Sequence, residues 1–306
     1  SERDLGHDYI ISLPDRLTDS VRNTLPTPWD AVTTVMDGGL GGGELGVLVA
    51  PAGIGKSWCL QSLGAHLVRQ GKTVAHYTLE LNANYVGLRY DTVFSGITTS
   101  NIKFYQEDVQ KVIDTLTGKL IIKYYPTRSA TVNTLAAHLK QMEIQEIKPD
   151  VVIVDYADIL KPTTFYKEKR HSTGETYENL RGMAGEFDIP VWTASQANRS
   201  SLEEEVIDAS KIAEDYSKVM TADFVMSVSR KVEDKIANTG RFHVIKNRFG
   251  VDGITFPASI NTNTGLIQVH EASTVGGQQA QGKMNNSEEY LRKTLSQKYK
   301  DMGGFE

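Results

Sequence analysis

The chain has little of several features that mark whole classes of protein. Its 306 residues include one cysteine, Cys59, so no disulfide can form within the chain and a disulfide-stapled fold is excluded. The longest apolar runs, around Val47 and Val151, are far shorter than the ~20 residues that span a bilayer. Neither charge dominates, because 33 Lys and Arg stand against 38 Asp and Glu, a formal net charge of -5. A surface coated in positive charge is therefore excluded, and nucleic-acid contact would need a local basic cluster.

An ordinary composition, 40% hydrophobic and 23% charged, indicates a soluble globular chain. We expect no membrane partner and a cytoplasmic location, because a lone cysteine and the lack of a secretory leader fit a reducing compartment. The first residue is Ser1 rather than methionine, so we expect a processed product or a fragment of a longer protein.

The spacing of apolar residues divides the chain into three parts. Residues 1–34 are interpreted as a linker or docking arm, 35–271 as one α/β domain, and 272–306 as a flexible linker and a tail helix. That tail is either a marginal helix or a peptide that docks on a partner. Strands are expected at 44–50, 72–80, 119–125, 149–160, 189–196, 222–230, 241–248 and 253–261. Helices are expected at 55–71, 82–96, 105–118, 129–147 (capped by Ser129), 174–187 and 211–220. This order predicts a mostly parallel sheet flanked by helices, with antiparallel strands at its C-terminal end.

A glycine-rich turn joins the first buried strand to the following helix. It reads "APAGIGKS" over residues 50–57, and Ala50 stands where the pattern G-x-x-x-x-G-K-[ST] has its first glycine. Backbone N–H groups of such a turn converge on phosphate oxygens, aided by the helix dipole, whereas the plainer interpretation is a glycine turn alone. The predicted nucleotide-binding residues are Ala52, Gly53, Ile54, Gly55, Lys56, Ser57 and Trp58. In this set Lys56 supplies positive charge and Ser57 a hydroxyl for Mg²⁺.

Two acidic side chains follow strands that end near this turn. Asp155 ends the apolar run "VVIVD" and is the expected second ligand of Mg²⁺, with Asp158 as a competitor further along. Glu80 ends the strand that follows the phosphate helix, and it is either the base that positions water or a solvated strand end.

Three further side chains are of types found in nucleotide-driven motor proteins. Gln196 ends a strand and could contact the γ-phosphate, although a purely structural role is open. Lys246 and Arg248 lie two apart, so both are expected on one face of a strand. They form either an exposed basic edge or a cation pair that reaches a neighbouring subunit's nucleotide.

Together these motifs resemble the RecA-type motor domain of hexameric replicative helicases of the DnaB family, from about Leu25 to His270. The segments that carry the resemblance are "LPTPWDAVTTVMDGGLGGGELGVLVAPAGIGKS", "YTLELN", "VVIVDYADIL", "ASQANRS" and "KNRFG". "KYYPT" and "KIAEDYSKVMTADFVM" look closest to the helicases of T-even-like bacteriophages. Bacterial members carry Arg-Glu-Ser-Gly in a DNA loop, whereas residues 213–216 here are Ala-Glu-Asp-Tyr, so the role of that arginine cannot be transferred.

The resemblance implies a RecA-like P-loop NTPase core that binds ATP and Mg²⁺ and hydrolyses ATP between subunits of a six-membered ring. It also implies 5′ to 3′ movement on single-stranded DNA, duplex unwinding, and a place in bacterial or bacteriophage replication with primase and a helicase loader as partners. Within it, Glu80 is the catalytic glutamate, Asp155 the magnesium aspartate, Gln196 the sensor, and Lys246 with Arg248 the trans-acting pair. The family also has an N-terminal collar domain, which we do not expect within residues 1–24 because so short a segment cannot build one.

DNA-contacting residues are sought in two loops. The loop after Asp155 is the most basic in the chain and interleaves its cations with aromatic residues, although a solvated charge run is the alternative. The segment after Gln196 is acidic in part but better placed for coupling. The candidates are Lys167, Lys169, Arg170, Arg199 and Lys218.

Two other functions remain open on this sequence. A RecA-like recombinase would use the same nucleotide site in an open filament, and an ATP-gated switch would have no role on DNA. Closed rings in electron micrographs would indicate a helicase, and open filaments a recombinase. Stimulation of ATP turnover by single-stranded DNA would distinguish a helicase from an ATP-gated switch.

Overall fold

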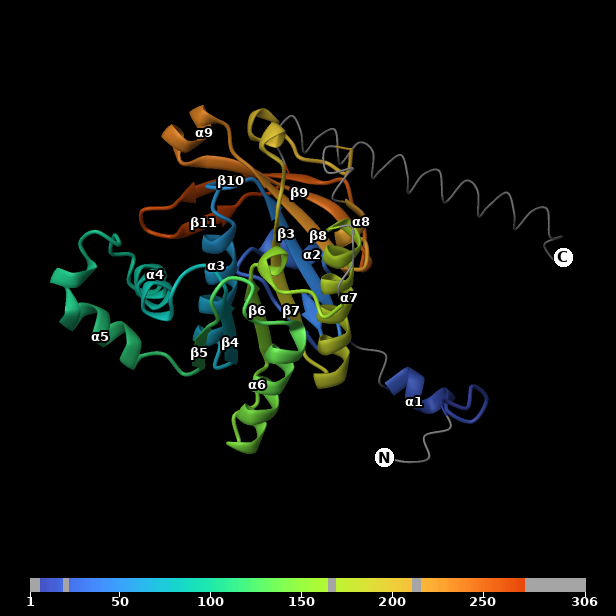
Figure 1. Cartoon of the computed structure of the whole chain (residues 1–306). Helices are drawn as coiled ribbons and strands as arrows, with labels where there is room; N and C mark the ends of the chain where they lie inside the picture. Colours follow the sequence, from blue (N-terminus) through green and yellow to red (C-terminus); the bar gives the residue numbers. More distant parts are fainter. Residues whose placement is uncertain (1–5, 19–21, 165–168, 211–215, 273–306) are drawn as a thin grey trace, which may run out of the picture.

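One nine-stranded sheet forms the centre of the molecule (Figure 1). A computed structural model describes residues 6–18, 22–164, 169–210 and 216–272, and the structural statements below concern those ranges. The strand order is β11-β10-β9-β8-β3-β7-β6-β4-β5. The strands are β3 (Leu45–Ala50), β4 (Thr73–Thr78), β5 (Lys119–Tyr124), β6 (Val151–Asp155), β7 (Val191–Gln196), β8 (Phe224–Ser229), β9 (Thr239–Asn247), β10 (Thr255–Asn261) and β11 (Leu266–Val269). Neighbours from β8 to β5 pair in parallel and those from β8 to β11 antiparallel, which confirms the predicted sheet.

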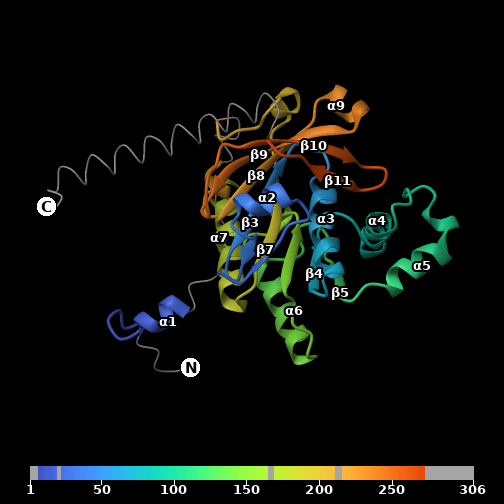
Figure 2. The ribbon, with the colours of Figure 1, turned by 180° about the vertical axis from the view of Figure 1, so that it is seen from behind.

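Helices cover both faces of this sheet (Figures 1 and 2). The helices are α1 (Leu13–Thr18), α2 (Asp30–Val35), α3 (Lys56–Arg69), α4 (Ala83–Ser95), α5 (Gln106–Asp114), α6 (Val132–Ile144), α7 (Lys169–Phe187), α8 (Tyr216–Val219) and α9 (Val232–Ala237), with short 3₁₀ turns η1 (Ile102–Phe104), η2 (Ala157–Ile159) and η3 (Arg199–Glu203). Strand β3 lies between the two layers, and all its residues are buried. Leu48 belongs to the apolar cluster with α2 and α3, whereas Val47 and Val49 belong to the cluster with α6 and α7. A strand covered on both faces therefore reads as continuously apolar in the sequence.

Two helix starts differ from the sequence prediction. The cap of α6 is Thr131, which shares a capping box with Thr134, so the prediction of Ser129 was wrong. The Ser129 hydroxyl instead donates to the carbonyl oxygen of Pro126 at 2.6 Å. Helix α7 begins at Lys169, so its first turn includes residues expected in a loop.

Residues 22–34, assigned from the sequence to an arm, pack onto the core. Strand β1 (Thr24–Leu25) pairs with β2 (Leu40–Gly41), and the buried ring of Trp29 lies 5.2 Å from that of Phe242. Trp29 Nε1 also donates to the carbonyl oxygen of Ile267 at 3.2 Å. Helix α1, by contrast, has no buried residue. Among the described helices, none is both long and apolar enough to cross a bilayer.

Replacing Trp29 by alanine tests whether this segment stabilises the core. We expect Trp29→Ala to lower the free energy of unfolding by about 3–5 kcal/mol, because it removes a buried indole and its hydrogen bond. Chemical denaturation monitored by circular dichroism measures the change. The exposed Tyr9 is the control, and Tyr9→Ala should change stability by less than about 0.5 kcal/mol. Equal small effects for both variants would show that residues 22–34 are not integral to the fold.

Candidate functional site

The glycine-rich turn lies where β3 ends and α3 begins. Gly53 and Gly55 have φ of 75° and 115°, a left-handed conformation that residues with a Cβ rarely adopt. Ile54 between them is fully buried and anchors the turn to the core, whereas Ala52 and Gly53 are exposed. Because Gly55 precedes the first turn of α3, the N–H groups of that turn and the positive end of the helix dipole face one point. The geometry suits a polyphosphate.

Lys56 lies in a small network with two neighbouring strand ends. Its side chain is 8% exposed, and its Nζ lies 3.9 Å from the centroid of the Tyr156 ring. The Tyr156 hydroxyl donates to Oε1 of Gln196 at 3.1 Å. Gln196 ends β7 opposite Ala50, the last residue of β3. The sequence-predicted lysine and sensor glutamine are therefore brought together, with Tyr156 between them.

Asp155 fits a magnesium ligand. It is 4% exposed at the end of β6, and its Oδ1 has no hydrogen-bond partner among the described residues. Burial raises the pKa of Asp155, while Ser57, Lys56 and Arg89 act in the opposite direction. No group of three or more His, Cys, Asp or Glu residues suited to a metal occurs in the described ranges. A site with one carboxylate and one hydroxyl suits Mg²⁺, which takes its remaining ligands from phosphate and water.

Glu80 lies at the same carboxyl end of the parallel strands. The N–H of Leu79 donates to the carbonyl oxygen of Asp155 at 3.0 Å, so the ends of β4 and β6 lie side by side. Glu80 follows directly and is exposed. Burial raises the pKa of Tyr156 to about 12, and the charge of Glu80 contributes to that rise. The same charge opposes ionisation of Asp155. The Glu80 carboxylate therefore lies near the turn and is separate from the expected Mg²⁺ ligands.

Asp158, the competing metal ligand, is already fully hydrogen-bonded. Its Oδ1 accepts from the Tyr177 hydroxyl at 2.7 Å, and its Oδ2 from the N–H of Gln196 at 2.9 Å and the Ser195 hydroxyl at 3.2 Å. Lys218 adds an ion pair to Oδ2 at 3.3 Å. These contacts assign Asp158 to the support of Gln196. They also place the Lys218 ammonium, predicted to contact DNA, in a buried ion pair away from solvent.

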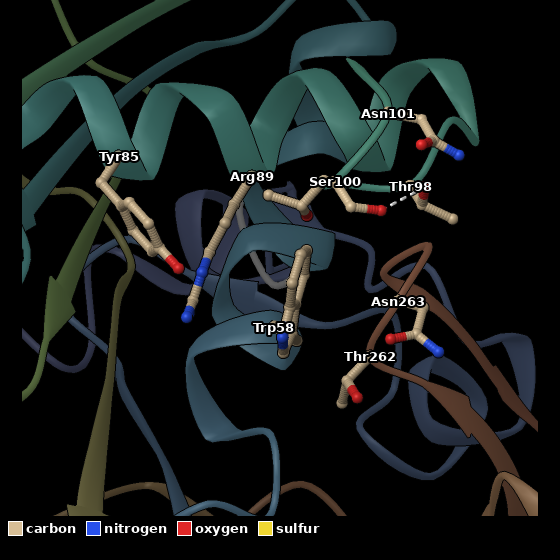
Figure 3. Close-up of a pocket in the computed structure, with 9 residues that line it drawn as sticks. Trp58, Tyr85, Arg89, Thr98, Ser100, Asn101, Thr262 and Asn263 are labelled. Atoms are coloured by element: carbon tan, nitrogen blue, oxygen red, sulfur yellow. Dashed lines mark hydrogen bonds between the residues drawn. The ribbon is translucent and has the colours of Figure 1, made fainter. Parts of the chain in front are cut away.

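A cavity of about 650 Å³ adjoins the glycine-rich turn (Figure 3). The guanidinium carbon of Arg89 lies 5.0 Å from the Trp58 ring and 5.1 Å from that of Tyr85, so its plane is bracketed by two aromatic side chains. Thr262 closes the pocket next to Gly55. The other lining residues are Thr98, Thr99, Ser100, Asn101 and Asn263. Aromatic and polar groups thus lie together beside the predicted phosphate site.

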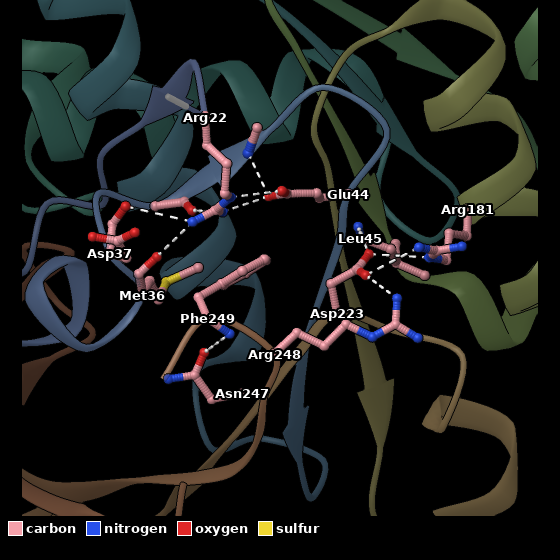
Figure 4. A network of polar contacts seen from close by, with 12 residues as sticks. Arg22, Met36, Asp37, Glu44, Leu45, Arg181, Asp223, Asn247, Arg248 and Phe249 are labelled. Atoms are coloured by element: carbon pink, nitrogen blue, oxygen red, sulfur yellow. Dashed lines mark hydrogen bonds and ion pairs between the residues drawn. The ribbon is translucent and has the colours of Figure 1, made fainter. Parts of the chain in front are cut away.

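The predicted trans-acting pair, Lys246 and Arg248, lies at the other end of the strands, where the parallel strands begin. Arg248 directly follows β9, and its N–H donates to the carbonyl oxygen of Asp223 before β8. The side chain of Asp223 accepts from the N–H of Leu45, the first residue of β3 (Figure 4). The turn before α3 lies at the other end of β3, about 17 Å away at about 3.3 Å per residue. Lys246 lies beside this cluster, and its Nζ donates to the Met220 carbonyl oxygen.

The DNA candidates are only partly placed. Lys167 lies outside the described residues. Lys169 and Arg170 begin α7, where only the backbone is described. Arg199 is exposed in η3, three residues after Gln196, on the same edge as the glycine-rich turn.

Sequence reasoning missed Asp223 and Arg181. Both Nε and Nη2 of Arg181 donate to the Asp223 carboxylate, at 3.1 and 3.2 Å. The detectable signal was an aspartate directly before the apolar run "FVMSVS", where a buried acid demands partners. Which cations supply them is set by the fold, because Arg181 is 42 residues away.

Comparisons with known proteins bear on the family and the fold of the chain. The family model described as the DnaB-like helicase C terminal domain matches residues 25–258. A DnaB-like replicative helicase of Enterobacteria phage T4 is 28% identical over 260 residues, covering 80% of this chain and 55% of the relative. The replicative DNA helicase DnaB of Helicobacter pylori strain J99 is 22% identical over 168 residues, 53% of this chain and 34% of the relative. The chain thus spans about half or less of these relatives.

Two solved structures share the fold. One, described as an ATPase domain, aligns with a TM-score of 0.70 and 17% identity, covering 84% of this chain and 96% of that one. A DnaB-like replicative helicase, studied with its primase interactions, aligns with a TM-score of 0.71 and 16% identity, covering 88% and 67%. The predicted RecA-like core is confirmed, and with the family match over residues 25–258 the chain belongs to the DnaB-like helicase C-terminal domain family.

Proposed function

We propose that this chain is the ATP-hydrolysing motor domain of a replicative DNA helicase, which moves 5′ to 3′ on single-stranded DNA and unwinds duplex DNA. It works in a ring, six-membered by the family resemblance, whose nucleotide sites lie between copies of the chain. The family membership supports the class of activity, and the geometry supports the arrangement of the sites.

The observation that carries the proposal is the separation of the two half-sites. Lys56, Ser57 and Asp155 lie at the carboxyl edge of the parallel strands, and Arg248 lies about one strand length away at the opposite edge. A single copy cannot join them. When two copies meet carboxyl edge to amino edge, the cations of one face the phosphate site of the other, and repetition of that contact around an axis closes a ring.

Each residue has a distinct role in this site. The N–H groups from Ala52 to Trp58 bind the phosphates of ATP, and Lys56 adds charge at their terminal end. Ser57 and Asp155 would hold Mg²⁺, which neutralises phosphate charge when bound. The exposed Glu80 carboxylate orients the attacking water and accepts its proton. Lys246 and Arg248 of the neighbour stabilise the charge that develops on the transferred phosphoryl group.

The cavity beside the turn is proposed to hold the nucleoside part of ATP. Trp58 and Tyr85 offer aromatic surface, Arg89 offers a planar cation, and the Thr262 side chain lies next to the phosphate turn. Stacking on such groups binds a base with little hydrogen-bond specificity.

Gln196 links hydrolysis to the DNA-facing loops. Its side chain accepts a hydrogen bond from Tyr156, whose ring contacts the Lys56 ammonium. Its backbone N–H donates to Asp158. Loss of the γ-phosphate would change the contacts of Gln196 and the position of η3, which begins at Arg199. We propose Arg199, with the basic segment that includes Lys167, Lys169 and Arg170, as the phosphate-contacting groups for single-stranded DNA. Primase and a helicase loader are proposed partners on the family resemblance alone.

Lys56→Ala and Glu80→Gln separate binding from hydrolysis. Lys56→Ala should weaken ATP binding at least tenfold, because it removes the buried cation at the phosphates. Glu80→Gln should keep the Kd for ATP within about twofold and lower kcat at least a hundredfold, since it removes only the acceptor for the water proton. Fluorescent-nucleotide titration and phosphate release, with and without single-stranded oligonucleotide, measure both.

The outcomes of that experiment bear on the other functions. Stimulation of wild-type turnover by single-stranded DNA supports a motor, whereas indifference to DNA would favour an ATP-gated switch. Equal loss of binding in the two variants would remove Glu80 from the catalytic role.

Mixing two inactive variants tests the shared site. Arg248→Ala and Lys56→Ala subunits should each have little turnover, because each lacks one half of the site. Mixed 1:1, they should recover up to about a quarter of wild-type turnover, since random assembly pairs an intact turn with an intact Arg248 at that frequency. Native mass spectrometry, with one variant isotope-labelled, verifies that mixed assemblies form. No recovery in verified mixed assemblies would contradict a shared site.

Lys218→Ala tests whether this lysine supports Asp158 or contacts DNA. Removal of one partner of the buried Asp158 ion pair should lower the free energy of unfolding by about 2 kcal/mol. The exposed Arg199 is the matched cation, and Arg199→Ala should leave stability unchanged but weaken binding of single-stranded DNA. Denaturation and fluorescence anisotropy measure the two effects. A Lys218→Ala variant with unchanged stability and weakened DNA binding would restore the original prediction.

A further inference from the structure

One buried carboxylate holds Arg248 on its own subunit. The Nη1 of Arg248 lies 2.6 Å from Oδ1 of Asp223 (Figure 4). Asp223 is 2% exposed, whereas the Arg248 side chain is 48% exposed. Within the described ranges this is the guanidinium's one hydrogen bond, so its Nε and Nη2 remain available as donors.

Asp223 is fixed independently of Arg248. Its Oδ2 accepts from the N–H of Leu45 at 2.9 Å and from Nε of Arg181 at 3.1 Å. Nη2 of Arg181 donates to Oδ1 at 3.2 Å. The carboxylate is therefore tied to the start of β3 and to α7, and it forms a fixed acceptor for the Arg248 guanidinium.

The charges around Asp223 do not cancel. Arg181 balances the single negative charge of Asp223, which leaves the charges of Arg248 and Lys246 at this edge. The pKa of Lys246 is lowered, chiefly by burial, and the charge of Arg248 adds to the shift, that of Asp223 opposes it, and that of Arg181 adds less. An anion brought to this edge would relieve the mutual repulsion of the cations.

The backbone beside Arg248 is held from the other side. Asn247 Nδ2 donates to the carbonyl oxygens of Val35 at 2.6 Å and Val251 at 3.0 Å. The ring of Phe249 lies 3.6 Å from the guanidinium carbon of Arg22, which itself forms a two-contact pair with Glu44 (Figure 4). Among the described residues, the end of the Arg248 side chain keeps the single hydrogen bond to Asp223.

We propose that Asp223 and Arg181 are positioning residues for the neighbouring copy's ATP site and that they act through Arg248. Asp223 holds Nη1, so that Nε and Nη2 are presented outward to the γ-phosphate before the two copies close on it. Arg181 neutralises Asp223, so that the carboxylate orients Arg248 without cancelling its charge. The rotational freedom of Arg248 is thereby lost in advance of the reaction rather than during it. This inference rests on the proposed shared site.

A double-mutant cycle tests the proposal. Asp223→Asn keeps the size of the side chain and one acceptor oxygen but removes the charge. In the wild-type background it should lower DNA-stimulated kcat about tenfold and leave the KM for ATP within about twofold, because the nucleotide turn lies at the other edge. In an Arg248→Ala background it should cause no further loss. Asp234→Asn is the control, since it removes a 2.6 Å ion pair to Arg241 on the same sheet and should not change kcat.

Arg181 provides the second variant. Arg181→Ala should lower kcat in the same Arg248-dependent way, and Arg181→Lys should restore most of it, because the charge near Asp223 returns. This pair also carries the test if thermal melting shows that Asp223→Asn is not folded.

Three outcomes would overturn the proposal. The first is an unchanged kcat in folded Asp223→Asn and Arg181→Ala. The second is a loss of kcat in these variants that adds in full to the loss caused by Arg248→Ala. The third is a rise in the KM for ATP without a fall in kcat. If Arg248→Ala alone leaves kcat unchanged, the shared site itself fails, and that result is distinct from these three.

Discussion

In a parallel sheet all strands begin at one end of the sheet and finish at the other, and the proposed site depends on this difference between the two ends. All carboxyl ends of β3, β4, β6 and β7 meet at one edge, and that edge holds the glycine-rich turn, Asp155, Glu80 and Gln196. Antiparallel β9 returns the chain to the other edge, where Arg248 lies. The topology separates the two halves of the proposed site by about one strand length, and this separation is the reason we propose that another copy completes the site.

Hydrogen-bond satisfaction distinguishes two acids that look alike in the sequence. Asp155 ends β6 and Asp158 follows three residues later, and both are plausible magnesium ligands by spacing. In the structure Asp158 is surrounded by hydroxyl, N–H and ammonium donors, whereas Asp155 keeps a buried oxygen with no partner among the described residues. An unsatisfied buried carboxylate oxygen is costly unless a cation or a donor arrives, which is why Asp155 suits the metal.

Much of the fold could be predicted because its strands are long, apolar and separated by periodic helices. The glycine-rich turn could also be placed, since positive φ and a following helix require that residue pattern. The failures have local causes. The capping boundary of α6 depends on which of two nearby hydroxyls reaches the free N–H groups, and β1 is two residues long. Arg181, Asp223 and Lys218 could not be assigned because their partners are distant in sequence, and nothing in the acidic stretch before Lys218 shows that this lysine is buried.

Cryo-electron microscopy of the chain with single-stranded DNA and a non-hydrolysable ATP analogue tests the shared site most directly, because it measures the distance between the Arg248 guanidinium and the γ-phosphate on a neighbour's Lys56. The account predicts closed rings in which that distance is about 3 Å, a direct hydrogen bond. It is contradicted if Arg248 stays remote from every nucleotide in all assemblies observed, or if the nucleotide site is completed by cations of its own subunit.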